Sequence, residues 1–151
     1  MNDKTGAPAD RPTIQPGLFS RPRREPLRRV TIIAVGHCDA ASRRGGYEVL
    51  LESGEARRYM TNEFTDTTVN RCIIQGLVDA VGALKYPCAV ELVVATTLGF
   101  AKARKGKGPN RDLLRALVNG LDEGGHRYEV TEVTDGTGAS LRARIRRHRP
   151  G

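Results

Sequence analysis

Residues 30–35 read VTIIAV, a nearly continuous apolar run with the length of a single β-strand. A strand that is apolar on both sides needs cover on both of its faces, so this segment favours a sheet with helices packed against it. The 151 residues of the chain suit one domain. Because the chain has three Phe, four Tyr and no Trp, that domain must build a mainly aliphatic core.

The apolar and turn patterns along the rest of the chain predict an alternation of strands and helices. Strands are expected at 30–35, 47–53, 55–64, 88–96 and 126–133, and helices at about 67–85, 110–121 and 140–148. The resulting order is β-β-β-α-β-α-β-α. It predicts an α/β fold in which a single domain, residues 30–151, has a mixed five-stranded sheet with helices on its faces.

Residues 1–29 differ from the rest in composition. They contain five of the eight prolines, seven Lys or Arg and few apolar anchors, which is typical of a disordered, basic, Pro-rich N-terminal arm. Such an arm could lie along a phosphate backbone, order on a protein partner, or remain a free tail.

Positive charge is concentrated in three places. Residues 1–29, 101–111 and 142–149 together hold 17 of the 25 Lys and Arg residues, and the chain has a net charge of +8. Localised basic patches favour polyanions, nucleic acid first and acidic protein or lipid surfaces second, although solvated ends would look the same.

Cysteine usage and hydropathy indicate the compartment. The three cysteines are an odd number without close spacing, which favours reduced thiols in a cytoplasmic protein. No apolar run approaches the roughly 20 residues of a membrane span, and the N-terminus lacks the apolar centre of a secretory signal. We therefore expect no membrane partner.

Four short motifs resemble the ribonuclease H type I family in the right order and on the right elements. GGY at 45–47 stands where the family has GGYG, and TTVNR at 67–71 where it has TTNNR. ALKYPCAVEL at 83–92 is similar to the stretch entering the fourth strand, and PNRDLL at 109–114 to KNxDLW. The resemblance implies the family's fold and an activity that hydrolyses the RNA strand of RNA–DNA hybrids with two divalent metals held by four acids.

The positions that match those acids carry other residues. Val35 stands at the acid of the first strand, Ile73 at the glutamate that follows TTNNR, and Ala95 at the acid that ends the fourth strand. The terminal helix, where the last acid belongs, is basic. Since hard cations need oxygen ligands, we interpret Val35, Ile73 and Ala95 as a degenerate former metal site, and we expect no bound metal and no cofactor.

Three nearby acids are candidates for relocated metal ligands. Asp39 lies beyond the end of the first strand, Asp79 lies on another face of the first helix, and Glu91 lies four residues early in the fourth strand. None is expected to converge with another. His37 and His126 have no visible acid or nucleophile partner, and His126 is expected to be solvated after its Gly-Gly turn.

The resemblance and the charge pattern indicate which residues could bind phosphate. The family grips the DNA strand with the Thr and Asn of its TTNNR stretch, although the Thr here can equally cap the helix. A basic, Gly-rich segment takes the place of a family protrusion, and the terminal arginines form a cationic end. The candidates are Thr68, Asn70, Arg71, Lys102, Arg104, Lys105, Lys107, Arg142, Arg144 and Arg146.

These features favour a non-catalytic ribonuclease H-like domain that binds RNA–DNA hybrid, RNA or DNA through its phosphates, as an accessory or architectural subunit of a larger protein or ribonucleoprotein complex. Two alternatives stay open. One is a protein–protein scaffold that docks acidic partners. The other is a residual metal-dependent ribonuclease H with relocated ligands.

Overall fold

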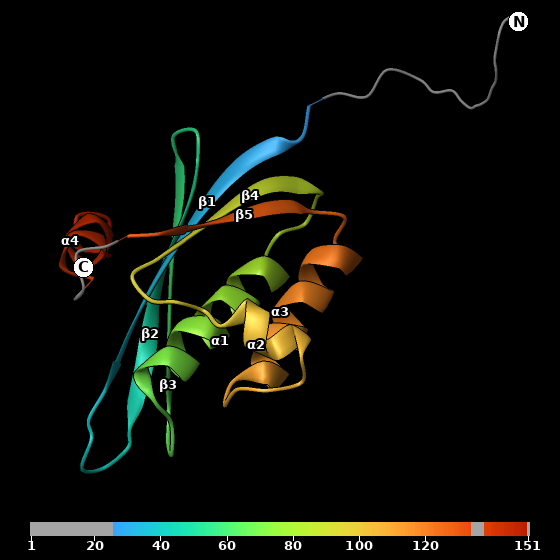
Figure 1. The fold of residues 1–151 in the computed structure, drawn as a ribbon. Coiled ribbons are helices and arrows are strands. Elements are labelled where there is room, and N and C mark those ends of the chain that lie inside the picture. Colours follow the sequence, from blue (N-terminus) through green and yellow to red (C-terminus); the bar gives the residue numbers. More distant parts are fainter. Residues whose placement is uncertain (1–25, 134–137, 151) are drawn as a thin grey trace, which may run out of the picture.

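A computed structural model describes residues 26–133 and 138–150, and Figure 1 shows their arrangement. The helices and strands follow the predicted order, with one short helix added. They are β1 (Arg28–Cys38), β2 (Gly45–Ser53), β3 (Ala56–Phe64), α1 (Val69–Gly82), β4 (Cys88–Val94), α2 (Phe100–Arg104), α3 (Arg111–Glu123), β5 (Arg127–Glu132) and α4 (Ala139–Arg146).

All five strands form one mixed sheet in the order β3-β2-β1-β4-β5. β1, β2 and β3 pair antiparallel through hairpins, whereas β4 joins β1 in parallel and β5 joins β4 in parallel. Parallel neighbours need a crossover connection. Helix α1 lies in the connection that returns the chain from β3 to β4 beside β1, and α2 and α3 lie in the one between β4 and β5. The predicted fold class, a single α/β domain with a mixed five-stranded sheet, is confirmed.

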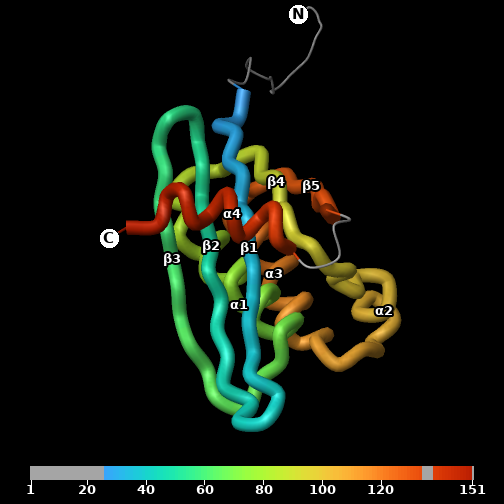
Figure 2. Tube along the Cα trace, turned by 90° about the vertical axis from the view of Figure 1, so that its left-hand side faces the viewer, coloured from blue at the N-terminus to red at the C-terminus, as the bar shows by residue number. Residues whose placement is uncertain are grey.

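The sheet is covered on both faces, as the apolar run of β1 requires. Ile32 and Ala34 point into a large core beneath α1 and α3, while Ile33 and Val35 point into a smaller core beneath α4. Figure 2 shows α4 lying across the strands on the face opposite α1 and α3. β1, β2 and β4 each contribute side chains to both cores.

Helix α1 lies unusually close to the strands beneath it. A Cβ at Gly36 of β1 would meet the Val69 carbonyl oxygen at 2.8 Å, and a Cβ at Gly76 of α1 would meet Val49 Cγ2 at 2.9 Å. Only glycine fits at both places without a shift of the neighbours. The start of α1 is therefore pressed against the end of β1.

Two boundaries differ from expectation. β1, expected from residue 30, begins at Arg28, because Arg28 and Arg29 pair in register with Cys88 and Ala89 of β4. Residues 1–25 of the N-terminal arm predicted at 1–29 lie outside the described residues. The segment predicted as a basic loop after β4 contains α2.

Two further features concern the whole chain. Cys38, Cys72 and Cys88 are free thiols. Within the described residues, no helix has both the length and the apolar character that crossing a bilayer requires.

Candidate nucleic-acid interface

A cavity of about 160 Å³ lies where the end of β1, the end of β4, the start of α1 and the start of α4 meet. Its lining comprises Ala34, Val35, Gly36, Val69, Asn70, Ile73, Ala95, Thr96, Gly138 and Arg142. The three positions that the family resemblance places at metal-binding acids, Val35, Ile73 and Ala95, thus share one cavity. They come from β1, from α1 and from the residue after β4.

The side chains of this cavity do not fit a divalent metal. Val35 and Ile73 are 3% and 5% exposed, and they belong to the two apolar cores of the domain. Its lining includes no carboxylate among the described residues, and nowhere in 26–133 and 138–150 do three His, Cys, Asp or Glu side chains group as metal ligands. Mg²⁺ and Mn²⁺ need carboxylate or other oxygen ligands that an aliphatic wall cannot supply.

The three acids that are candidates for relocated metal ligands lie in three separate places. Asp39 is exposed in the β1–β2 connection and accepts hydrogen bonds from the backbone and side chain of Ser42, which lower the pKa of its carboxyl group. Asp79 on α1 accepts from the hydroxyl of Tyr47 at 2.7 Å and from Gln75 at 2.9 Å. Both carboxylates are engaged in structural contacts of their own.

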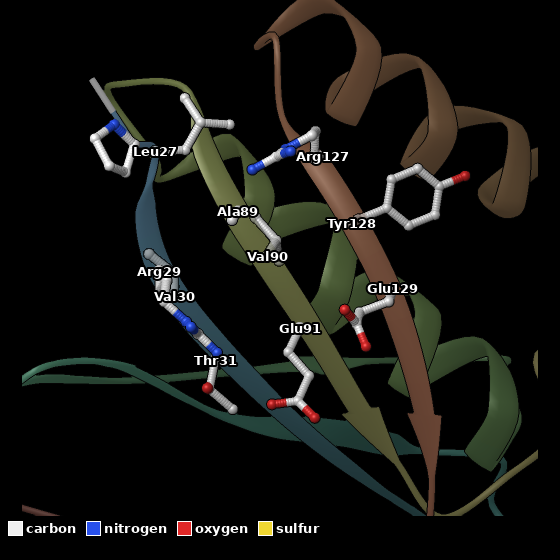
Figure 3. A pocket seen from close by; sticks show the side chains of 11 residues that line it. Leu27, Arg29, Val30, Thr31, Ala89, Val90, Glu91, Arg127, Tyr128 and Glu129 are labelled. Atoms are coloured by element: carbon white, nitrogen blue, oxygen red, sulfur yellow. The ribbon is translucent and has the colours of Figure 1, made fainter. Parts of the chain in front are cut away.

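Glu91 lies in a different pocket, shown in Figure 3, with a volume of about 660 Å³. It accepts a hydrogen bond from the Thr131 hydroxyl at 2.8 Å and stands opposite Glu129 of β5. Arg29 and Arg127 line the same pocket. Glu91 does not line the cavity of Val35, Ile73 and Ala95.

Arg142 brings a positive charge to that cavity. It is half-buried on α4, and one of its terminal nitrogens donates to the Gly36 carbonyl oxygen at 2.8 Å. On the opposite side, Thr96 donates its hydroxyl proton to the Asn70 side-chain oxygen at 3.1 Å. The cavity therefore offers a guanidinium, an amide and a hydroxyl above an aliphatic floor.

The start of α1 is held by its own side chains. Thr68 is the N-cap and accepts from the Arg71 backbone N–H at 3.2 Å, so this threonine has the capping role. The Arg71 guanidinium makes a two-pronged contact with Asp112 of α3, at 3.1 and 2.8 Å. Hydrogen bonding from Arg71 lowers the pKa of Asp112 to about 2, and the same hydrogen bond raises the pKa of Arg71.

The basic segment after β4 is fully presented to solvent. Its four cations, Lys102, Arg104, Lys105 and Lys107, are exposed, and among the described residues none of them has an ion-pair partner. We call these four residues the α2 cation cluster. The sequence predicted no helix in this Gly-rich segment, because α2 is only five residues long. Gly99, Gly106 and Gly108, which flank it, all have positive φ.

A groove connects the α2 cation cluster to the start of α1. It has a volume of about 520 Å³, and Lys102, Lys107 and Arg111 lie along it together with Asn70. Asn70 also lines the Arg142 cavity. The groove and the cavity thus meet at one exposed amide, which places cations on both sides of it.

The terminal arginines divide into two groups. Arg144 is ion-paired with Glu52 of β2, and Arg149 with Glu48 of β2 at 2.6 Å. Arg146 is exposed. Sequence reasoning missed the partners of Arg144 and Arg149 because Glu48 and Glu52 lie far away in the chain and gave no local signal.

His126 departs from its expected solvated state. It is 9% exposed, and its Nδ1 accepts a hydrogen bond from the Cys88 backbone N–H at 3.0 Å. This contact ties the start of β4 to the end of α3 and gives the histidine a structural role. His37, in contrast, is exposed at the end of β1.

Comparisons with known proteins place this arrangement among ribonucleases H. No family model matches the chain. Ribonuclease H of Symbiobacterium thermophilum is 38% identical over 108 residues, which are 61% of this chain and 74% of that relative. Ribonuclease H of Verminephrobacter eiseniae is 29% identical over 118 residues, covering 68% of this chain and 76% of the relative.

Solved structures agree at the level of the fold. RNase H1 from Halobacterium salinarum NRC-1 superposes with a TM-score of 0.58 at 19% identity, covering 76% of this chain and 92% of that one. LC9-RNase H1, a type 1 RNase H with the type 2 active-site motif, gives a TM-score of 0.60 at 18% identity, with 80% and 72% covered.

Proposed function

The chain belongs to the ribonuclease H family, and from that membership we propose that it binds nucleic acid through the phosphate backbone without cleaving it. The ligand class is an RNA–DNA hybrid, RNA or DNA. The protein acts as an accessory or architectural subunit of a larger complex.

The observation that carries the absence of cleavage is the lining of the Arg142 cavity. Hydrolysis by two metals requires carboxylates that hold both ions around the scissile phosphate. Val35, Ile73 and Ala95 offer no oxygen ligand, and Arg142 adds positive charge where cations would otherwise be bound. A guanidinium beside two divalent ions would repel them.

Binding is supported by the α2 cation cluster and the groove beside it. Lys102, Lys107 and Arg111 line this groove together with the Asn70 amide and one carboxylate, Glu132. Arg104 and Lys105 add exposed positive charge beside it, so the surface suits successive phosphates. Each phosphate neutralised by Lys or Arg releases condensed counterions, so such a surface binds nucleic acid with little dependence on base sequence.

Fluorescence anisotropy tests the proposal. An end-labelled RNA–DNA hybrid is titrated with the full chain in Mn²⁺ at two salt concentrations. We expect a stable rise whose affinity falls roughly a thousandfold between 50 and 200 mM salt if six or more phosphates are neutralised. Changing the α2 cation cluster to glutamine should weaken binding by at least about tenfold and flatten the salt dependence.

A matched control removes the same charge from the end of the sheet where β1, β3, β4 and β5 begin. Four of the exposed cations there, Arg28, Arg58, Lys85 and Arg127, are each changed to glutamine. This variant should lose much less affinity than the variant of the α2 cation cluster. Equal losses in the two variants would mean that only net charge matters and that the groove has no special role.

Two outcomes would contradict the proposal. An anisotropy rise that decays with time in Mn²⁺, and whose decay is prevented by Asp39→Asn or Glu91→Gln, would identify a residual ribonuclease with relocated ligands. No rise with hybrid, RNA or DNA at low salt would exclude nucleic-acid binding, and a protein that co-purifies after nuclease treatment would then support the scaffold alternative.

A further inference from the structure

We propose that the Arg142 cavity binds one phosphate group directly, with the guanidinium of Arg142 in the role that a metal ion would otherwise have. This inference rests on the proposed function, since the phosphate would belong to a bound nucleic acid. It adds a defined site within the binding surface, whose chemistry differs from that of the exposed cations.

Arg142 differs from the other half-buried arginines of this domain in its side-chain partners. Three arginines in the described ranges are half-buried, namely Arg71, Arg142 and Arg144. Arg71 is paired with Asp112, and Arg144 with Glu52. Arg142 has only the neutral Gly36 carbonyl oxygen as a side-chain partner among the described residues.

A partly desolvated guanidinium with no counter-charge is costly, because removing a cation from water is repaid only by an anion or by several hydrogen bonds. A guanidinium carries five N–H donors in a planar fork that matches the oxygens of a phosphate group. With one terminal nitrogen engaged by Gly36, the remaining donors of Arg142 are available for a second acceptor.

The surroundings of Arg142 suit an anion. No Asp or Glu is among the residues that line the cavity, so no described carboxylate there would repel a phosphate. The side-chain NH₂ of Asn70 has no acceptor within the described part of the chain, because the Thr96 contact uses the Asn70 oxygen. Asn70 can therefore donate to an anion from the side opposite Arg142.

The dimensions of the cavity and its opening are also compatible with this ligand. Its volume of about 160 Å³ exceeds the roughly 30 Å³ share of one water molecule, so a group of several heavy atoms fits. Asn70 is exposed and lines both this cavity and the groove of the α2 cation cluster. A strand whose phosphates follow that groove would reach Arg142 at its end.

The first experiment compares Arg142→Gln with Arg144→Gln, a matched change on the same helix that removes the same charge. Binding of the labelled hybrid is measured in EDTA across a range of salt concentrations. Arg142→Gln should weaken binding about tenfold and reduce the salt slope by about 0.9, the value for one phosphate contact. Arg144→Gln should melt at a lower temperature through loss of the Glu52 pair but keep both the affinity and the slope of the folded protein.

Arg142→Lys separates charge from geometry. It should recover part of the affinity, because lysine keeps the charge but lacks the planar fork. Identical affinities and slopes for Arg142→Gln and Arg144→Gln would overturn the inference while leaving the proposed function intact.

A second measurement does not depend on hybrid binding. The full chain is labelled with ¹⁵N, and NMR follows the Nε resonance of Arg142 during titration with dimethyl phosphate. This resonance is assigned through its loss in Arg142→Gln. We expect a saturable shift that sodium chloride at the same ionic strength does not produce. No shift would overturn the inference, whereas a shift in a protein that binds no hybrid would support it and contradict the proposed function.

Discussion

At the scale of single residues, the partner of each cation decides what that cation can do. Arg71, Arg144 and Arg149 hold elements of the domain together through Asp112, Glu52 and Glu48. A binding role for Arg71 and Arg144, which the sequence suggested, would require breaking those pairs. The exposed α2 cation cluster and the half-buried Arg142 carry no such restriction, and they are the cations on which the proposed interface rests.

The Arg71–Asp112 pair makes a pH-dependent contribution to stability. The pKa of Asp112 is lowered to about 2 in the folded protein, compared with about 3.9 for a free aspartate. A depressed carboxyl pKa stabilises the fold above the unfolded-state value, and this contribution is lost as the pH falls through the folded-state value. Because the Asp112 side chain is 61% exposed, the pair contributes at most about 1 kcal/mol.

We therefore expect Asp112→Asn to lower the free energy of unfolding by up to about 1 kcal/mol at pH 7, with a difference from wild type that shrinks between about pH 4 and pH 2. Urea denaturation at several pH values measures this. Asp122→Asn, on the same helix but without an ion pair to any described residue, serves as the control. A loss in Asp112→Asn that stays constant with pH would show that its charge is not the source.

At the scale of elements, the close packing of α1 on the sheet fixes the geometry of the cavity. Gly36 lets the first turn of α1 approach the end of β1, and Gly76 lets the middle of the helix approach β2. Together these contacts set the position of Asn70 and Ile73 relative to Val35. A small displacement of α1 would change the cavity that they line.

Two glycines of α1 test this packing on one helix. A Cβ at Gly76 would meet Val49 and the Tyr47 ring at 2.9–3.0 Å, whereas a Cβ at Gly82 would meet nothing within 4 Å. Gly76→Ala should lower the free energy of unfolding by about 1–3 kcal/mol, and Gly82→Ala should be neutral or stabilise by up to about 1 kcal/mol. Thermal melts of both variants measure the difference, and equal melting temperatures would contradict close packing at Gly76.

Elements differ in how well the sequence predicts them. The order of strands and helices follows from apolar periodicity and from Gly and Pro punctuation, which are local signals. Helix α2 was missed because five residues between glycines show no helical period. The family resemblance anticipated that Val35, Ile73 and Ala95 match positions of one site, but nothing local distinguished Arg142 from Arg144, because their partners come from distant strands.

At the scale of the whole molecule, the proposed binding surface lies at one end of the sheet. The groove of the α2 cation cluster and the Arg142 cavity meet at the end of the sheet where α1 begins. The described chain begins at the opposite end, where β1 starts, and the Pro-rich segment 1–25 precedes it in the sequence. If a nucleic acid contacts both ends of the sheet, two separate sets of cations would neutralise its phosphates.

Deleting residues 1–25 tests whether that segment contributes. It removes five Lys or Arg residues and three acids, and it leaves every described residue in place. We expect an unchanged melting temperature and a salt slope of hybrid binding that is shallower by about 0.9 for each phosphate the segment neutralises. An unchanged slope would show that the segment makes no phosphate contact, and would leave a protein partner as its ligand.

The position of β3 at the edge of the sheet has a consequence for self-association. Nine residues of unpaired backbone edge can template a strand from another molecule, which is a route to aggregation. Arg57 and Arg58 are consecutive and exposed, so their side chains leave opposite faces of this edge. A second copy that docked its own β3 there in parallel and in register would bring like charges together on both faces, so the two arginines oppose that mode of sheet extension.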